Sequence, residues 1–308
     1  MGNRLRVAVI GVGHLGSIHA RIYSQLESAQ LVAVCDLDPK RAQTIARQFR
    51  CRPVTDFRQL PGEVDAVSVA VPTQEHFPVA SLFLTQGIHT LVEKPITATV
   101  QEADDLLRLA AASGALLQVG HVERFNAALR RVQDSLSDPR FVEVHRLAPF
   151  QPRGTEVGVV LDLMIHDIDL LLGLVRKPVE RVDAVGVKVL TPFEDIANAR
   201  VTFQNGTVAN LTASRISKEA MRKFRIFQTD AYISMDFLGQ SVDLFRKENG
   251  RISHERLAIS GEEPLKAELS AFVESIQQRR PPPVSGREAR DALHLALEVT
   301  RLIHQNHP

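Results

Sequence analysis

A glycine-rich turn near the start of the chain constrains the fold more than any other feature. Gly11, Gly13 and Gly16 form a G-x-G-x-x-G pattern directly after an apolar run, Leu5–Ile10. The same turn opens a helical pattern over His14–Leu26. A glycine turn that joins a buried strand to a helix is typical of a strand–helix–strand unit in a parallel sheet.

Four further apolar runs continue this alternation of strands and helices. They have little polar face and are separated by amphipathic segments, as in a parallel sheet that is covered on both sides. In one separating helix, Thr99 and Glu102 fit a capping box. The alternation predicts a doubly wound α/β domain. The four runs are Leu31–Cys35, Val64–Val71, Ile88–Val92 and Leu116–Val119.

The glycine turn also predicts a ligand. Gly11 permits the tight turn, Gly13 lets the backbone approach a pyrophosphate, and Gly16 lets the helix pack closely on the strand. The helix start at His14–Leu15 adds free N–H groups and the positive end of the helix dipole. Asp36 follows the next strand, 20 residues after Gly16, where a carboxylate accepts hydrogen bonds from ribose hydroxyls. We therefore expect a bound dinucleotide.

The identity of the dinucleotide depends on the charges around Asp36. A carboxylate repels a 2′-phosphate, which favours NAD over NADP. Lys40 and Arg41 lie close behind it in the sequence and keep NADP open, because cations can contact a phosphate. The same two cations are equally typical of a solvated helix.

Polar residues follow other strands of the predicted sheet at the edge where ligands bind in such folds. Pro72, Thr73 and His76 come after the run Val64–Val71, and His121 comes after Leu116–Val119. We expect all four to lie near the cofactor. Thr73 could equally cap a helix.

The regular alternation of predicted strands and helices ends after about residue 121. Alternating segments such as Phe141–Leu147 and Met221–Phe227, and a type I′ turn signal at Asn205–Gly206, predict antiparallel strands with one open face. The fold class is therefore α/β. A doubly wound parallel sheet over residues 1–121 precedes an α+β domain with an open, mostly antiparallel sheet over residues 122–285.

Two sets of polar residues lie next to or within apolar segments of the sequence. Glu93–Lys94–Pro95 ends a strand at the ligand-binding edge, although a surface ion pair would give the same pattern. Asp162 and His166 lie four residues apart in an apolar helix, Val159–Leu174, and so share one of its faces. Polar groups on a buried helix need partners or a function. A satisfied core histidine is the simpler explanation of His166 alone.

Together, the glycine turn, Glu93–Lys94–Pro95 and the Asp162–His166 pair resemble the Gfo/Idh/MocA oxidoreductases in order and spacing over nearly the whole chain. The resemblance implies an N-terminal Rossmann domain, a C-terminal α/β domain, and a last helix over about residues 286–308 that packs back on the Rossmann domain. It also implies a homodimer or homotetramer formed through the open sheet.

The resemblance further implies hydride transfer between a secondary alcohol of a sugar ring and nicotinamide. Lys94 is then the catalytic lysine, and Asp162 and His166 are the substrate-site pair. His166 suits the general base and Lys94 suits stabilisation of charge on the same oxygen, but which of them takes the proton stays open. Glu93 lies beside the cofactor and holds Lys94. No metal is expected, and the three catalytic side chains should converge at the nicotinamide.

Short stretches such as Val122–Asn126, Pro149–Gly154 and Arg222–Phe227 resemble the branch of this family that oxidises the 3-hydroxyl of UDP-N-acetylglucosamine. A nucleotide-sugar carries a pyrophosphate, so its site should contain additional cations. Besides the residues above, the candidate substrate contacts are Arg124, Asn126, Arg153 and Arg215.

Two other functions stay open, namely a dehydrogenase of a free polyol such as inositol and a regulator that binds a dinucleotide without chemistry. The net charge of +1 argues against nucleic-acid binding. No apolar run is long enough to span a membrane, and no signal-peptide pattern is expected at the start. With only two cysteines, Cys35 and Cys51, the chain suits a reducing cytoplasm.

Overall fold

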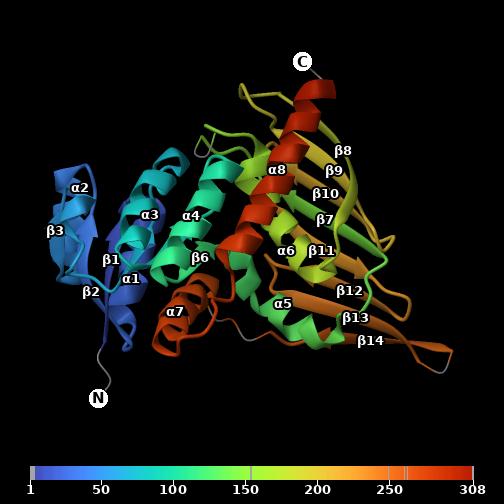
Figure 1. Cartoon of the computed structure of the whole chain (residues 1–308). Coiled ribbons are helices and arrows are strands. Elements are labelled where there is room, and N and C mark those ends of the chain that lie inside the picture. The colour runs from blue at the N-terminus through green and yellow to red at the C-terminus, as the bar shows by residue number, and fades with distance from the viewer. Residues whose placement is uncertain (1–3, 153–154, 249, 260, 262, 307–308) are drawn as a thin grey trace. The chain divides into compact units, whose positions relative to one another are not determined.

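The computed structural model describes residues 4–152, 155–248, 250–259, 261 and 263–306 (Figure 1). The chain divides into two compact units. The first combines Met1–Val122 with Glu263–Arg290, and the second combines Glu123–Glu262 with Asp291–Pro308.

The first unit contains a parallel sheet of six strands in the order β3-β2-β1-β4-β5-β6. The central strand β1 lies between β2 and β4, so the strand order reverses at this point and leaves a ligand-binding crevice at the carboxyl ends. The strands are β1 Leu5–Ile10, β2 Ala29–Cys35, β3 Arg52–Val54, β4 Ala66–Val69, β5 His89–Glu93 and β6 Leu117–Gly120.

Helices connect these strands, and two of them, α2 and α4, begin at side-chain caps. Asp38 caps α2, and Thr99 forms the predicted capping box with Glu102 at the start of α4. The helices of this unit are α1 His14–Gln25, α2 Pro39–Phe49, α3 His76–Thr85, α4 Val100–Ser113 and α7 Pro264–Gln277, with short 3₁₀ turns η1 Phe57–Gln59 and η2 Thr73–Glu75.

The second unit contains an eight-stranded sheet in the order β14-β13-β12-β11-β7-β10-β9-β8. Only the neighbours β7 and β10 are parallel, and the other neighbours are antiparallel. The strands are β7 Phe141–Leu147, β8 Val179–Val187, β9 Ile196–Phe203, β10 Val208–Ser214, β11 Met221–Phe227, β12 Ala231–Asp236, β13 Ser241–Glu248 and β14 Arg251–Leu257.

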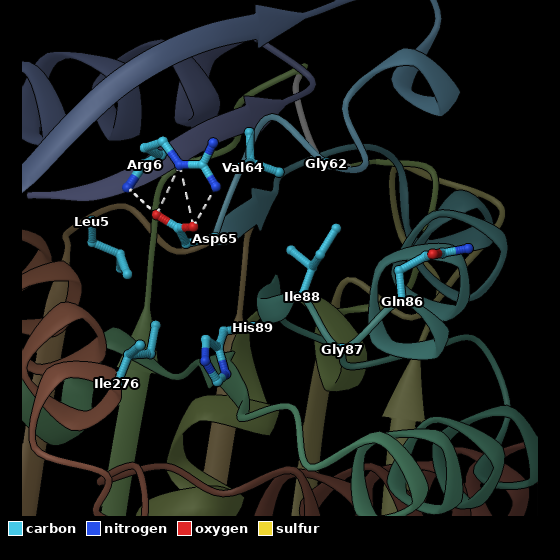
Figure 2. Close-up of a pocket in the computed structure, with 10 residues that line it drawn as sticks. All are labelled: Leu5, Arg6, Gly62, Val64, Asp65, Gln86, Gly87, Ile88, His89 and Ile276. Atoms are coloured by element: carbon cyan, nitrogen blue, oxygen red, sulfur yellow. Dashed lines mark hydrogen bonds and ion pairs between the residues drawn. The ribbon is translucent and has the colours of Figure 1, made fainter.

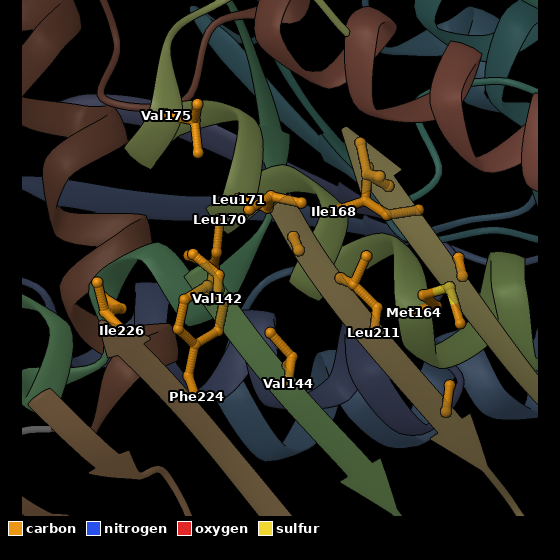
Figure 3. Packing of buried hydrophobic residues seen from close by; sticks show 14 of the residues in the cluster. Val142, Val144, Met164, Ile168, Leu170, Leu171, Val175, Leu211, Phe224 and Ile226 are labelled. Carbon is orange, nitrogen blue, oxygen red and sulfur yellow. The ribbon is translucent and has the colours of Figure 1, made fainter. Parts of the chain in front are cut away.

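One face of this sheet carries the core of the second unit. Val142 and Val144 of β7 pack with Leu211 and Phe224 against residues such as Ile168 (Figure 3). The alternating burial along β7 and β11 shows that the opposite face is more exposed. The helical segments of this unit are η3 Val122–Phe125, α5 Ala127–Val132, η4 Gln133–Ser135, η5 Val160–Met164, α6 Ile165–Val175 and most of α8 Gly286–Asn306.

The last helix differs from the expectation that it packs on the first domain. Only its start, Gly286–Arg290, belongs to the first unit. Its apolar positions recur at helical spacing and lie in the core of the second unit. These positions are Ala292, Leu295, Ala296, Val299 and Ile303.

The helix that packs in the core of the first unit is α7 instead. Leu269, Phe272 and Val273 pack there with Tyr23 of α1 and Val7 of β1. The chain therefore returns to the first unit before the last helix begins, which places Glu263–Arg290 in that unit.

Two local details also differ from the predictions. The hairpin at Asn205–Gly206 forms, but only Gly206 has a positive φ, 83°, and the Phe203 amide donates to the Thr207 carbonyl. This is a three-residue loop with a left-handed glycine rather than a type I′ turn. The predicted helix over Val159–Leu174 begins with a π-helical segment, η5, and continues as α6.

Substitution Phe272→Ala should lower the free energy of unfolding of the first unit by about 3–5 kcal/mol, because the ring is fully buried between α7 and the sheet core. Urea unfolding would measure the change. The control Leu238→Ala, at a side chain that is 47% exposed, should change stability by no more than about 0.5 kcal/mol. Equal effects of the two variants would contradict the contribution of α7 to the core of the first unit.

Candidate active site

The glycine turn after β1 brings α1 unusually close to the strand. A Cβ atom on Gly16 would lie 1.8 Å from the carbonyl oxygen of Gly11, which no side chain can occupy. Gly11 has a φ of 81°, in the left-handed region that favours glycine. A Cβ atom on Gly13 would meet no described atom within 4 Å, so the fold itself leaves open space at this position.

The start of α1 has the properties of a phosphate site. Gly13 is its N-cap and no side chain caps the helix, while His14 and Leu15 in the first turn are exposed. Helix N-termini of this kind bind phosphate groups through backbone N–H groups and the helix dipole. The open space at Gly13 and the uncapped amides fit the pyrophosphate of a dinucleotide.

Asp36 lies at the end of β2 and is nearly buried, with 8% of its surface exposed. Its carboxylate accepts hydrogen bonds from the backbone amides of Val12 and Asp38, both at 3.0 Å. Arg41 approaches both carboxylate oxygens at 3.3 Å. Burial, followed by the charge of Asp36, raises the pKa of the neighbouring Cys35 to about 12, so this cysteine is a thiol at neutral pH.

The loops after β4 and β5 are connected by a buried histidine. His76, which is 1% exposed, places Nδ1 2.9 Å from the carbonyl oxygen of Pro95 and Nε2 2.9 Å from that of Val71. Burial lowers the pKa of His76, and the two carbonyls oppose that shift. Pro72 and Thr73 lie in the same loop, and Thr73 begins the 3₁₀ turn η2 without capping it.

Glu93 and Lys94 follow β5 at the same edge. The Glu93 carboxylate lies 3.1 Å from Nε2 of His19, and its other oxygen accepts from the Lys94 backbone amide at 3.3 Å. Glu93 thus contacts the backbone of Lys94. His121 follows β6 and is buried, with its amide donating to the Val119 carbonyl.

The second unit holds the other predicted catalytic pair. Asp162 lies in the π-helical segment η5 and His166 follows in the first turn of α6. Single π-helical turns within helices are frequent at functional sites. Arg215 is 5% exposed, donates to the Val157 carbonyl at 2.6 Å and places the same nitrogen 3.9 Å from the Asp162 carboxylate. Two of the predicted substrate contacts therefore lie together.

The remaining predicted substrate contacts have partners within their unit or lie outside the described residues. Arg124 grips the buried Asp169 with two bonds of 2.7 Å. Asn126 is the N-cap of α5 and accepts from the Ala128 amide at 3.0 Å. Their substrate roles stay predictions. Arg153 is outside the residues that the structure describes.

A buried ion pair holds α6 against the sheet. Arg146 of β7 donates to the two oxygens of Asp167 at 2.7 and 2.8 Å and to Glu123 at 2.9 Å. Burial disfavours the charged arginine, but the two carboxylates outweigh it and raise the pKa of Arg146. Burial raises the pKa of Asp167, and Arg146 opposes that rise. Because Asp167 adjoins His166, this pair fixes the backbone that carries the imidazole.

The sequence analysis missed His19 and Arg146. Both could have been found from periodicity. Arg146 alternates with Val142 and Val144 on the buried face of β7, and a charge at such a position needs a partner. His19 lies one turn from Tyr23 on the buried face of α1.

A cavity of about 450 Å³ lies at the opposite edge of the first sheet (Figure 2). Its lining includes Leu5 and His89, which begin β1 and β5. Arg6 beside it is already paired with Asp65, at 2.7 Å. The glycine turn and Lys94 follow the carboxyl ends of these strands, so this cavity is separate from the candidate site.

Across the described part of the chain, no group of three or more His, Cys, Asp or Glu side chains is arranged to hold a metal ion. Over the same residues, no helix combines the length and apolarity needed to cross a membrane.

Two family profiles match the chain. One is described as an oxidoreductase family with an NAD-binding Rossmann fold and matches residues 5–121. The other is described as the GFO/IDH/MocA C-terminal domain and matches residues 111–234.

Individual proteins resemble the chain over different lengths. It is 40% identical over 302 residues to UDP-N-acetylglucosamine 3-dehydrogenase of Acidithiobacillus ferrooxidans, with 96% of each protein covered. A solved structure of that dehydrogenase matches with a TM-score of 0.94 at 39% identity, over 99% of both chains. Inositol 2-dehydrogenase 4 of Saccharopolyspora erythraea is 34% identical over 200 residues, which cover 61% of this chain and 58% of the relative.

The two glycines should respond differently to alanine. Gly16→Ala should prevent correct folding of the first unit, since the new Cβ would overlap the Gly11 carbonyl. Gly13→Ala should keep the fold, because its Cβ meets no described atom, and should weaken dinucleotide binding at least about tenfold by blocking backbone approach. Circular dichroism and fluorescence titration with NAD would measure the two effects. A Gly13→Ala protein that binds NAD normally would contradict the assigned phosphate site.

Proposed function

Because the chain belongs to the GFO/IDH/MocA oxidoreductase family, we propose that it is an NAD-dependent dehydrogenase that acts on the 3-hydroxyl of UDP-N-acetylglucosamine. The observation that supports this substrate most strongly is the similarity to the A. ferrooxidans enzyme along nearly the full length of both proteins. The inositol dehydrogenase match covers a smaller part of the chain, which makes a free polyol the second candidate.

The proposed reaction separates a hydride and a proton from one secondary alcohol. The dinucleotide, when bound, supplies a nicotinamide ring that accepts the hydride or returns it. His166 takes the hydroxyl proton at its imidazole, the side-chain group whose unperturbed pKa in proteins lies nearest neutral pH. Lys94 donates a hydrogen bond to the same oxygen and stabilises its negative charge. Asp162 orients the substrate or His166.

Two features of the second unit support this assignment. The Arg146–Asp167 pair fixes the start of α6 and with it the backbone at His166. The guanidinium of Arg215 is a buried cation that lies close to the carboxylate of Asp162, a predicted substrate contact. Such a cation can orient the Asp162 carboxylate or contact an anionic group of the substrate.

NAD is the proposed cofactor. The Asp36 carboxylate is held in place by two backbone amides at the end of β2, where it would repel a 2′-phosphate. Arg41 is half exposed and balances part of this charge, which explains why discrimination against NADP should be strong but incomplete.

We also propose that the protein forms a homodimer or homotetramer through the open face of its second sheet, in the cytoplasm. A row of aromatic rings crosses five neighbouring strands on that face, with ring centres 4.3–5.6 Å apart. Such a row offers a flat apolar surface to a second copy. Both cysteines are free, which suits a reducing compartment. The row consists of Phe141, Phe227, Tyr232, Phe245 and His254.

The substrate is tested by turnover with NAD and a panel of UDP-sugars and free polyols. UDP-N-acetylglucosamine should give NADH, and Lys94→Ala should lower kcat at least about a hundredfold while changing the Kd of NAD by less than about threefold. Lys177→Ala, at an exposed lysine, is the matched control and should behave as wild type. Turnover of inositol alone would support the polyol enzyme. NAD binding without turnover of any alcohol would support a regulator.

Cofactor choice is tested at Asp36. Asp36→Ala should lower the preference for NAD over NADP at least about tenfold, because it removes a carboxylate and releases Arg41 toward a 2′-phosphate. Asp38→Ala removes a neighbouring carboxylate that caps α2, so it should reduce stability and leave the preference unchanged. Fluorescence titration with both dinucleotides gives the ratio. An unaltered ratio in Asp36→Ala would refute the assigned role.

A further inference from the structure

His19 is buried without any exposed surface, and the proposed reaction does not use it. It lies on α1, and its ring connects two neighbouring strands of the first sheet. Nδ1 lies 2.7 Å from the hydroxyl of Ser68 in β4, and Nε2 lies 3.1 Å from Oε1 of Glu93 in β5. The ring therefore connects the helix after the glycine turn to the residue that precedes Lys94.

The contacts indicate which ring nitrogen carries the proton. Nε2 lies 3.1 Å from the Glu93 carboxylate, within ion-pair distance, and a carboxylate favours a protonated nitrogen there over a second acceptor. Nδ1 of a neutral ring then accepts from the hydroxyl of Ser68. Tyr23, also fully buried, contacts Ser68 in turn. Tyr23, Ser68, His19 and Glu93 therefore form one buried polar cluster that joins α1 to β4 and β5.

Glu93 occupies a place that only this local structure provides. It pairs with Gly120 of β6, and a Cβ atom on Gly120 would lie 2.7 Å from the carboxylate. The carboxylate therefore rests on the bare backbone of the next strand, where 90% of its side chain is shielded from solvent. A buried carboxylate needs a polar partner, and the imidazole of His19, with Nε2 3.1 Å from Oε1, lies beside it.

We propose that His19 is a positioning residue for Lys94 and acts through Glu93. His19 fixes the Glu93 carboxylate over Gly120, and the carboxylate accepts from the Lys94 backbone amide at 3.3 Å. From the other side, His76 holds the loop at the carbonyl of Pro95. The backbone at Lys94 is thereby fixed at its own amide by Glu93 and at the next carbonyl by His76. The proposal rests on the catalytic role that the proposed function gives to Lys94.

Two isosteric substitutions separate the contacts of His19. Glutamine places an amide N–H near the position of Nε2, whereas asparagine places its amide near Nδ1. His19→Gln should preserve the contact with Glu93 and keep kcat within about threefold of wild type. His19→Asn should lose it and lower kcat about tenfold to a hundredfold, with KM and the Kd of NAD within about threefold.

His89→Asn is the matched control, because His89 begins the same strand β5 at the end opposite Glu93, where its Nδ1 accepts from the Leu116 amide at 2.9 Å. It should leave kcat unchanged. Equal losses of kcat in His19→Asn and His19→Gln, or an unchanged kcat in folded His19→Asn, would overturn the proposal, since a packing role predicts no rescue by glutamine.

A double-mutant cycle with Glu93→Ala provides the second test. If His19 acts through Glu93, adding His19→Asn to Glu93→Ala should lower kcat no further, within about twofold. Additive losses would show that His19 acts by another route. Thermal unfolding of each variant identifies those that fail to fold, and the cycle is then completed with Ser68→Ala in place of His19→Asn.

A measurement without substrate keeps this proposal separate from the proposed function. In protein labelled with ¹⁵N-lysine, the Lys94 amide, assigned from its absence in Lys94→Arg, should shift in His19→Asn and keep its wild-type position in His19→Gln. If the wild-type protein turns over no alcohol, the proposed function is refuted and the positioning role of His19 is not affected. An unmoved Lys94 amide in His19→Asn would refute the positioning role alone.

Discussion

The close contact between Gly16 and the carbonyl oxygen of Gly11 is the constraint on which the first unit depends. It allows α1 to lie directly against the end of β1, so that the uncapped amides of its first turn face the ligand-binding edge of the sheet. The same closeness lets His19, one turn later, reach across to β4 and β5. A single steric requirement thus links the proposed phosphate site to the backbone that carries Lys94.

Much of the fold could be predicted from the sequence, because its elements have strong local signals. The strands β1, β7 and β11 and the Thr99 capping box match the predictions residue by residue, and the α/β fold class and the family resemblance are confirmed. The edge strand β3 was missed because it is only three residues long, contains Pro53 and is mostly exposed. The π-helical start of the helix at Asp162 could not be predicted, because the spacing of apolar residues there is the same as in an α-helix.

The sequence predicts the candidate site residues that belong to motifs at strand ends. It does not predict contacts between segments that lie far apart in the sequence. The glycine turn, Asp36 and Glu93–Lys94 lie at strand ends that the alternation of elements identifies. The partners of Arg124 and Arg146 could not be deduced, because each ion pair joins segments that the fold alone brings together. Each of these ion pairs fixes α6 within the second unit through a buried aspartate, Asp169 or Asp167.

The π-helical turn at Val160–Met164 has a consequence for how this enzyme could diverge. A turn of this kind is equivalent to one residue inserted into an α-helix. Deleting a single residue there would regularise the helix and rotate everything before it by about 100° around the axis, since 3.6 residues make a turn. Asp162 would then swing away from Arg215 while His166 stayed anchored beside Asp167. One codon is thus enough to turn the predicted substrate-site carboxylate away while the backbone at His166, the proposed base, stays in place.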